Sequence, residues 1–151
     1  MGVSVQATNR FLANHAMKLY DFDPDGVNPV DIDWVPFHSF FGLVVGFFRT
    51  VGAGAVDTLQ ILANTKADGS GDDVVVKVKD LTGIQPDAVG DQVWLEVTAE
   101  EIRQACTDAG KVPAAVSASV EFNVATDEGV VVYIRYAPRF AKDGLTADLV
   151  A

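Results

Sequence analysis

The sequence predicts an all-β protein, an antiparallel β-sandwich of jelly-roll type with one short helix in a strand connection. Three observations predict this fold. Runs rich in β-branched and aromatic residues recur at 74–79, 92–97 and 130–136, and such residues suit a pleated, half-buried surface. Turn signals separate the runs roughly every ten residues. Strands in an open chain bury their apolar faces by packing two sheets together.

The chain divides at its prolines. We expect residues 1–36 to form an amino-terminal arm or extended segment, and residues 37–151 to form the sandwich domain. Apolar residues between 9 and 22 follow neither a helical nor a strand period, so a short strand and a terminal arm both remain open for them. Four prolines and glycines between 24 and 36 then indicate turns and extended chain.

The most apolar run extends from Phe37 to Thr50. Its length and aromatic content predict a long buried strand, and Gly42 and Gly46 inside it indicate a bulge or a bend. The next two runs, 56–65 and 74–79, are joined by a polar, glycine-rich loop and predict a β-hairpin.

The following strand alternates Val93, Leu95 and Val97 with Trp94 on the other side. An aromatic residue of this size suits a sheet that is covered on both faces. Trp94 could face solvent, but we expect it to lie in the core of such a sheet.

One helix is predicted. Thr98 and Glu101 have the spacing of a capping box, so the helix begins there and runs to about Asp108, and Gly110 ends it. Cys106 is the only cysteine and lies on the inward side of this helix. We expect it to be a small buried hydrophobic residue, and one cysteine cannot form an internal disulfide.

The last two strands are expected at 116–126 and 130–136, each with apolar residues in alternation. Asp127–Gly129 lies between them and is typical of a turn. We expect the two strands to pair as antiparallel neighbours, with Pro138 ending the second.

The charge balance restricts the partners. Of the 151 residues, 21 are acidic and 11 are Lys or Arg, which gives a formal net charge of −10. Nucleic acid and anionic membranes would be repelled, so neither is an expected partner. The charge either keeps the protein soluble or marks an acidic outer face on an assembly.

The amino terminus has no pattern of a signal peptide, and the apolar run Phe40–Phe48 is too short to span a bilayer as a helix.

One acidic string resembles a calcium loop. Asp21, Asp23 and Asp25 precede Gly26, and oxygens at alternate positions followed by glycine are how a calcium loop of the EF-hand type opens. The twelfth position holds Ile32, where a bidentate glutamate is needed. A solvated acidic turn is therefore favoured, and no metal site is expected.

We expect no enzymatic activity. His15 and His38 are the only histidines, and they lie on separate segments without Cys, Asp or Glu at the spacing of metal ligands. No nucleophile elbow is present, and paired acids at the helix start are explained by the positive end of its dipole. We therefore expect no catalytic residue and no cofactor.

A partner-contact region is predicted near the carboxyl end. Arg135 and Arg139 stand beside Tyr136 and Phe140 in a chain that is otherwise poor in positive charge. Arginine with aromatic residues is typical of protein contact surfaces. The alternative is that Arg135 is a solvated outward residue of its strand.

Several motifs in this order resemble a known group. They are Thr58–Ala63, a glycine-rich acidic loop, Asp87–Asp91 before a strand, Val97–Ile102 at the helix start, Tyr133–Arg135 and Arg139–Phe140. The chain from roughly Phe37 to Ala151 is similar to the capsid decoration, or cement, proteins of tailed bacteriophages. These are minor structural proteins of the virion.

The resemblance implies a protein on the outer surface of the capsid, made in the cytoplasm of the host bacterium. It implies the major capsid protein as partner, a dimer or trimer as the form of the protein, and stabilisation of the head as its role. A structural component of the tail, fibre or neck is an alternative from the same particle. A carbohydrate-binding sandwich, with Trp34 or Trp94 stacked on sugar, is a further alternative.

Overall fold

The computed structural model describes residues 15–22, 30–31, 34–36, 40–83, 86–122 and 127–138, with the backbone alone described at 15–22, 30–31 and 137–138. Its strands are β1 (His15–Phe22), β2 (Val30–Asp31), β3 (Val35–Pro36), β4 (Phe40–Val51), β5 (Val56–Asn64), β6 (Asp73–Asp80), β7 (Gln92–Thr98), β8 (Ala115–Phe122) and β9 (Glu128–Pro138). The helix is α2 (Ala99–Asp108).

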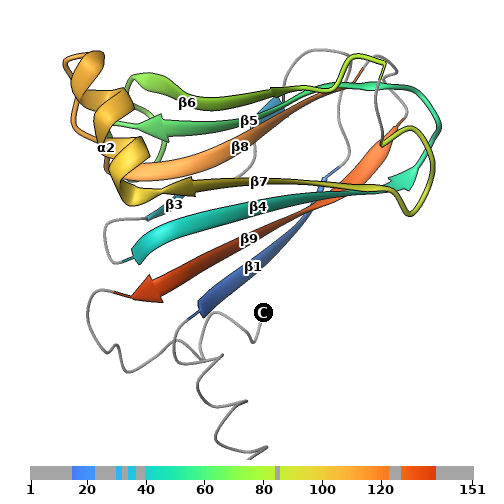
Figure 1. The fold of residues 1–151 in the computed structure, drawn as a ribbon, viewed down its shortest axis with the longest axis horizontal. Coiled ribbons are helices and arrows are strands. Elements are labelled where there is room, and N and C mark those ends of the chain that lie inside the picture. Colours follow the sequence, from blue (N-terminus) through green and yellow to red (C-terminus); the bar gives the residue numbers. More distant parts are fainter. Residues whose placement is uncertain are drawn as a thin grey trace, which may run out of the picture.

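The strands form two antiparallel sheets that pack face to face (Figure 1). Sheet A has the order β1-β9-β4-β7, and sheet B has the order β2-β8-β5-β6, with β3 also paired to β8. Because β2 and β3 pair with successive parts of β8, they act as one interrupted strand. Each sheet then has four strands, and the chain crosses repeatedly between the sheets, as in a jelly roll. The predicted fold class is confirmed.

The core lies between the sheets. Side chains from the inward positions of both sheets are almost completely buried, among them Leu43, Val45, Phe47, Leu59, Ile61, Val116, Val120, Phe122 and Tyr133. The rings of Phe47 and Phe122 meet edge to face across the layers, with centroids 5.5 Å apart. The hydroxyl of Tyr133 crosses from sheet A and accepts a hydrogen bond of 2.7 Å from the backbone nitrogen of Ala118 in β8.

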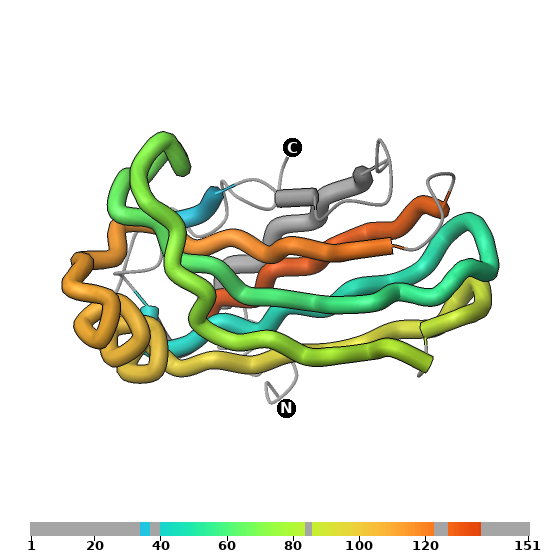
Figure 2. Tube along the Cα trace, turned by 90° about the horizontal axis from the view of Figure 1, so that it is seen from above, coloured from blue at the N-terminus to red at the C-terminus, as the bar shows by residue number. Residues whose placement is uncertain are grey.

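Helix α2 joins β7 to β8 and lies at one end of both sheets, as the view from above shows (Figure 2). Its first turn has the predicted capping box, because Thr98 accepts from the nitrogen of Glu101 and the Glu101 carboxylate accepts from the nitrogen of Thr98. Gly110 follows with a φ of 68°, a left-handed conformation that glycine adopts without strain. Cys106 is buried against the core, as expected.

The predicted hairpin is also confirmed, since β5 and β6 pair in antiparallel register. The buried side chain of Asn64 organises the loop between them. Its amide nitrogen donates to the carbonyl oxygens of Gly69 and Gly71, and its oxygen accepts from the nitrogen of Lys66. One amide therefore replaces the backbone partners that a tight turn would have supplied.

One pairing prediction is wrong. The strands β8 and β9 lie in different sheets: β8 pairs with β5, whereas β9 pairs with β1 and β4. Alternation shows only that one face of a strand is buried, and this is equally true of a hairpin partner and of a strand that crosses to the other sheet.

Part of the first 36 residues belongs to the sheets. For the segment 9–22, the structure gives a strand over His15–Phe22, which forms the edge of sheet A beside β9. The short strands β2 and β3 extend sheet B. Of the calcium-loop residues, Asp21 lies in β1, while Asp23 and Asp25 lie outside the described residues.

Candidate interaction surface

The side of sheet A that faces away from sheet B carries an unusual set of residues, which we call the outer face. On β4, β7 and β9 it consists of Gly42, Val44, Gly46, Phe48, Gln92, Trp94, Glu96, Thr98, Val130, Val132, Ile134 and Tyr136. A solvated face of an antiparallel sheet is normally polar, but most of these residues are apolar. Trp94 is exposed, Val44, Phe48, Val130 and Ile134 are half-buried, and Val132 is buried.

Two aromatic residues of the outer face lie over glycines of the central strand β4. A Cβ atom on Gly46 would overlap the indole ring of Trp94, and one on Gly42 would overlap the phenol ring of Tyr136. Of the predicted bulge or bend, the bulge does not occur at these glycines, because the pairing of β4 with β7 is regular through both and shifts against β9 only between Arg49 and Val51. The glycines instead make room for large rings from the neighbouring strands.

Trp94 is 39% exposed, so its predicted place in the core is wrong. Its neighbours Val93 and Leu95 face the core, and strict alternation puts Trp94 on the other side. The ring is held in place there. Its Nε1 donates to Oε1 of Gln92 at 2.9 Å, and the ring of Phe48 meets it edge to face at 5.2 Å.

Tyr136 is fixed by a carboxylate from the neighbouring part of the sheet. Its hydroxyl donates to Oε1 of Glu96 at 2.6 Å. This hydrogen bond, and then burial, raise the pKa of Tyr136 to about 12, because an ionised phenol would lose the bond and face the carboxylate. Both aromatic residues over the glycines therefore have defined positions before any partner arrives.

The charge on the outer face is negative. At the described positions of β4, β7 and β9 the face has one charged residue, Glu96. Neither Lys nor Arg occurs at these positions. Lys77 of β6 donates to the backbone oxygen of Glu96 at 2.7 Å and lies 3.7 Å from the carboxylate of Glu101, so it spans the edges of the two sheets.

The predicted partner-contact residues are separated by the fold. Tyr136 lies on the outer face, whereas Arg135 points between the sheets and is only 7% exposed. The Nη1 of Arg135 donates to the carbonyl of Pro36 at 2.9 Å, and its guanidinium lies 4.9 Å from the ring centre of Phe40. The alternative of a solvated Arg135 is therefore wrong. Arg139 and Phe140 lie outside the described residues.

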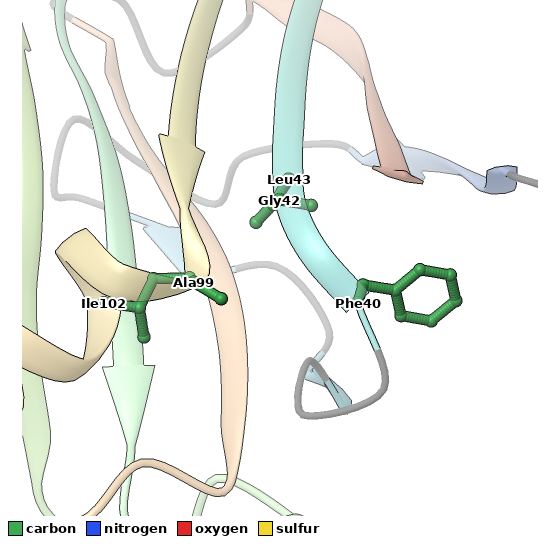
Figure 3. A pocket seen from close by; sticks show the side chains of 5 residues that line it. All are labelled: Phe40, Gly42, Leu43, Ala99 and Ile102. Atoms are coloured by element: carbon green, nitrogen blue, oxygen red, sulfur yellow. The ribbon is translucent and has the colours of Figure 1, made fainter. Parts of the chain in front are cut away.

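Other candidate sites are weaker. A small apolar hollow lies between the start of β4 and the start of α2, where Phe40 points away from Ala99 and Ile102 (Figure 3). It has no room for a water molecule. Within the described ranges, no three His, Cys, Asp or Glu side chains gather to hold a metal ion. No helix among the described residues is long and apolar enough to cross a membrane.

No protein-family model and no curated protein matches the chain. Among solved structures, it is similar to the Yersinia pseudotuberculosis-derived mitogen, with 12% identity and a TM-score of 0.42 over 87% of this chain and 92% of that one. It is also similar to the SPBc2 prophage-derived protein YomS, with 10% identity and a TM-score of 0.42 over 80% and 93% of the two chains. It is similar as well to a chain of sacbrood virus of honeybee, with 10% identity and a TM-score of 0.42 over 89% of this chain and 85% of that one. Values this low support no statement about function.

Proposed function

We propose that this protein is a virion structural protein, a decoration protein that binds the outer capsid surface of a tailed phage and stabilises the head. The observation that carries the proposal is the apolar outer face of sheet A on a chain of net charge −10. A contiguous apolar patch with ordered aromatic residues is typical of a surface that another protein covers. The resemblance of the sequence motifs to decoration proteins supports the choice of partner.

The action of such a protein is mechanical. Each copy would remove apolar surface of the outer face from water, at about 25 cal/mol per Å² of apolar area buried. A dimer or trimer would engage several capsid subunits at once, and the second contact of a linked pair forms at a high effective concentration. Many copies would then hold neighbouring subunits of the major capsid protein together against the pressure of packaged DNA.

A carbohydrate-binding sandwich is the second candidate, and Trp94 is the observation that favours it. Its ring is partly exposed and lies beside Gln92 and Glu96, which have hydrogen-bonding groups. Sugar-binding sites combine ring faces with a few polar groups of this kind. Against it, most residues of the outer face are apolar, which suits a protein partner better than a hydroxyl-rich ligand.

The test is the place and number of this protein in purified phage particles. Quantitative mass spectrometry is expected to find it in heads at a copy number that matches the capsid lattice. Heads that lack it are expected to release DNA at a lower temperature. Adding the purified protein to these heads is expected to raise the release temperature again. The low copy number of a tail or neck part would contradict decoration, and so would its absence from heads.

A further inference from the structure

We infer that the outer face of sheet A binds a protein surface that is apolar at its centre and basic at its rim, with Trp94 of the edge strand β7 as an anchor. The inference rests on the proposed function and names the chemistry of the partner. It also specifies one occupant, because the charge on this face opposes a second copy of the same chain.

Trp94 has the properties of an anchor. Its ring is supported from below by Gly46, its Nε1 is held by Gln92, and Phe48 fixes it from the side. A side chain that is already ordered loses little conformational entropy when a partner covers it. Tryptophan surrounded by apolar contacts is also the residue type most often found as a binding hot spot.

The charges on and near the outer face indicate which residues the rim of the partner surface would carry. The Glu96 carboxylate lies beside the apolar residues, and its Oε1 is bound to Tyr136. Among the described residues, Lys77 donates to the backbone oxygen of Glu96 and lies beside Glu101, and Arg135 is buried between the sheets, so neither of these two cations is paired with the Glu96 carboxylate. Lys or Arg on the partner would complete the contact and speed the encounter at low salt.

A second copy would fit this face poorly. In a two-fold contact the same patch faces itself, so the Glu96 carboxylate of each copy would lie against a patch that carries the same negative charge. Like charges opposed across an interface are unfavourable. A dimer or trimer of this protein would therefore form through another surface.

Binding to purified heads that lack the protein tests the inference. Trp94→Thr keeps a residue that suits a strand and is expected to weaken binding by at least about 30-fold. Glu96→Gln keeps a group that can accept from Tyr136 but removes the charge. It is expected to weaken binding several-fold at low salt and much less at high salt. Val112→Ser is the matched control, because Val112 is 79% exposed on the loop after α2, and its binding is expected to be unchanged.

A second measurement does not depend on those variants. The chain has two tryptophans, so in a Trp34→Phe variant the fluorescence comes from Trp94 alone. When heads bind, the emission of Trp94 is expected to shift to shorter wavelength, because its ring leaves water. Binding without a shift would overturn the inference.

The outcomes separate the two proposals. If the unaltered protein does not bind heads, the proposed function fails. If it binds, and Trp94→Thr and Glu96→Gln bind equally well, only the inference fails. A self-associated form that Trp94→Thr dissociates in sedimentation velocity would show a second copy as the occupant. An emission shift with soluble oligosaccharides but not with heads would show a sugar. Either result would overturn the inference.

Discussion

The Nη1 of Arg49 lies 2.5 Å from Oδ2 of Asp127, and both side chains are almost completely buried. Arg49 stands near the end of β4 and also donates to the carbonyl oxygens of Gly54 and Pro86, while Asp127 accepts from the nitrogen of Gly54. One ion pair therefore ties three connections together at the end of β4 away from α2. Its removal would affect loops that are far apart in the sequence.

The substitution Asp127→Asn is expected to lower the free energy of unfolding by about 3–5 kcal/mol, because it leaves a buried guanidinium without its counter-charge. Urea denaturation measures the change. Glu100→Gln is the control, since it breaks the exposed pair of Glu100 with Arg103 and is expected to change stability by less than about 1 kcal/mol. Equal effects of the two substitutions would contradict a structural role for the buried pair.

Gly46→Ala is expected to destabilise the protein by about 1–3 kcal/mol, because the new methyl group meets the ring of Trp94. The same substitution in a Trp94→Thr background is expected to cost much less, since the ring is gone. A double-mutant cycle by thermal or urea denaturation gives the coupling between the two positions. A coupling energy near zero would mean that Gly46 is not required to make room for the ring of Trp94.

Thr98→Ala is expected to cost about 1 kcal/mol, because the first turn of α2 loses the acceptor for the nitrogen of Glu101. Thr107→Ala, on the exposed side of the same helix, is the matched control and is expected to leave stability nearly unchanged. The helix joins β7 in sheet A to β8 in sheet B. Loss of the cap is therefore expected to appear in the global unfolding transition.

Stability is expected to fall as the pH rises from about 10 to about 12. The ordinary pKa of tyrosine is 10.0, and Tyr136 has its pKa raised to about 12 in the folded protein. Between these values the unfolded chain binds fewer protons than the folded one, so the free energy of unfolding decreases with pH. Below pH 10 the contribution is complete.

Urea denaturation across that pH range measures the decrease, and Tyr136→Phe is expected to reduce it. Glu96→Gln is the second variant. It removes the carboxylate that holds the phenol proton, so the absorbance of tyrosinate is expected to appear at lower pH. If the absorbance titration of Tyr136 in the unaltered protein lies at its ordinary value, the hydrogen bond with Glu96 does not form in solution.

The strand pattern of the sequence was enough to predict the sandwich, the hairpin of β5 and β6, and the capped helix. Each of these depends on short-range signals: alternation, a polar glycine-rich loop, and Thr98 three residues before Glu101. The position of β9 depends instead on which sheet the chain enters after β8. Packing between residues far apart in the sequence determines which sheet that is, and the local sequence at Asp127–Gly129 does not indicate it.

The outer face was missed although its signal is in the sequence. In β4 both alternating sets are free of charge from Phe40 to Phe48, and such a run was interpreted as a strand buried on both sides. In a two-layer sandwich, however, only one side of a strand can face the core. The second apolar side is therefore the sequence signal of the apolar outer face. Arg135 and Tyr136 likewise occupy opposite sides, so composition alone could not show which of them faces outward.

The apolar character of β4 has a further consequence for production of the protein. Its one charged residue, Arg49, stands near the end of the strand, so the stretch from Phe40 to Phe48 has no charge to keep unfolded copies apart. Segments with high β-propensity and no charge are those that stack into aggregates between chains. The surplus of acids elsewhere supplies the repulsion, and variants that reduce it would precipitate in the expressing cell while their native state remained as stable as before.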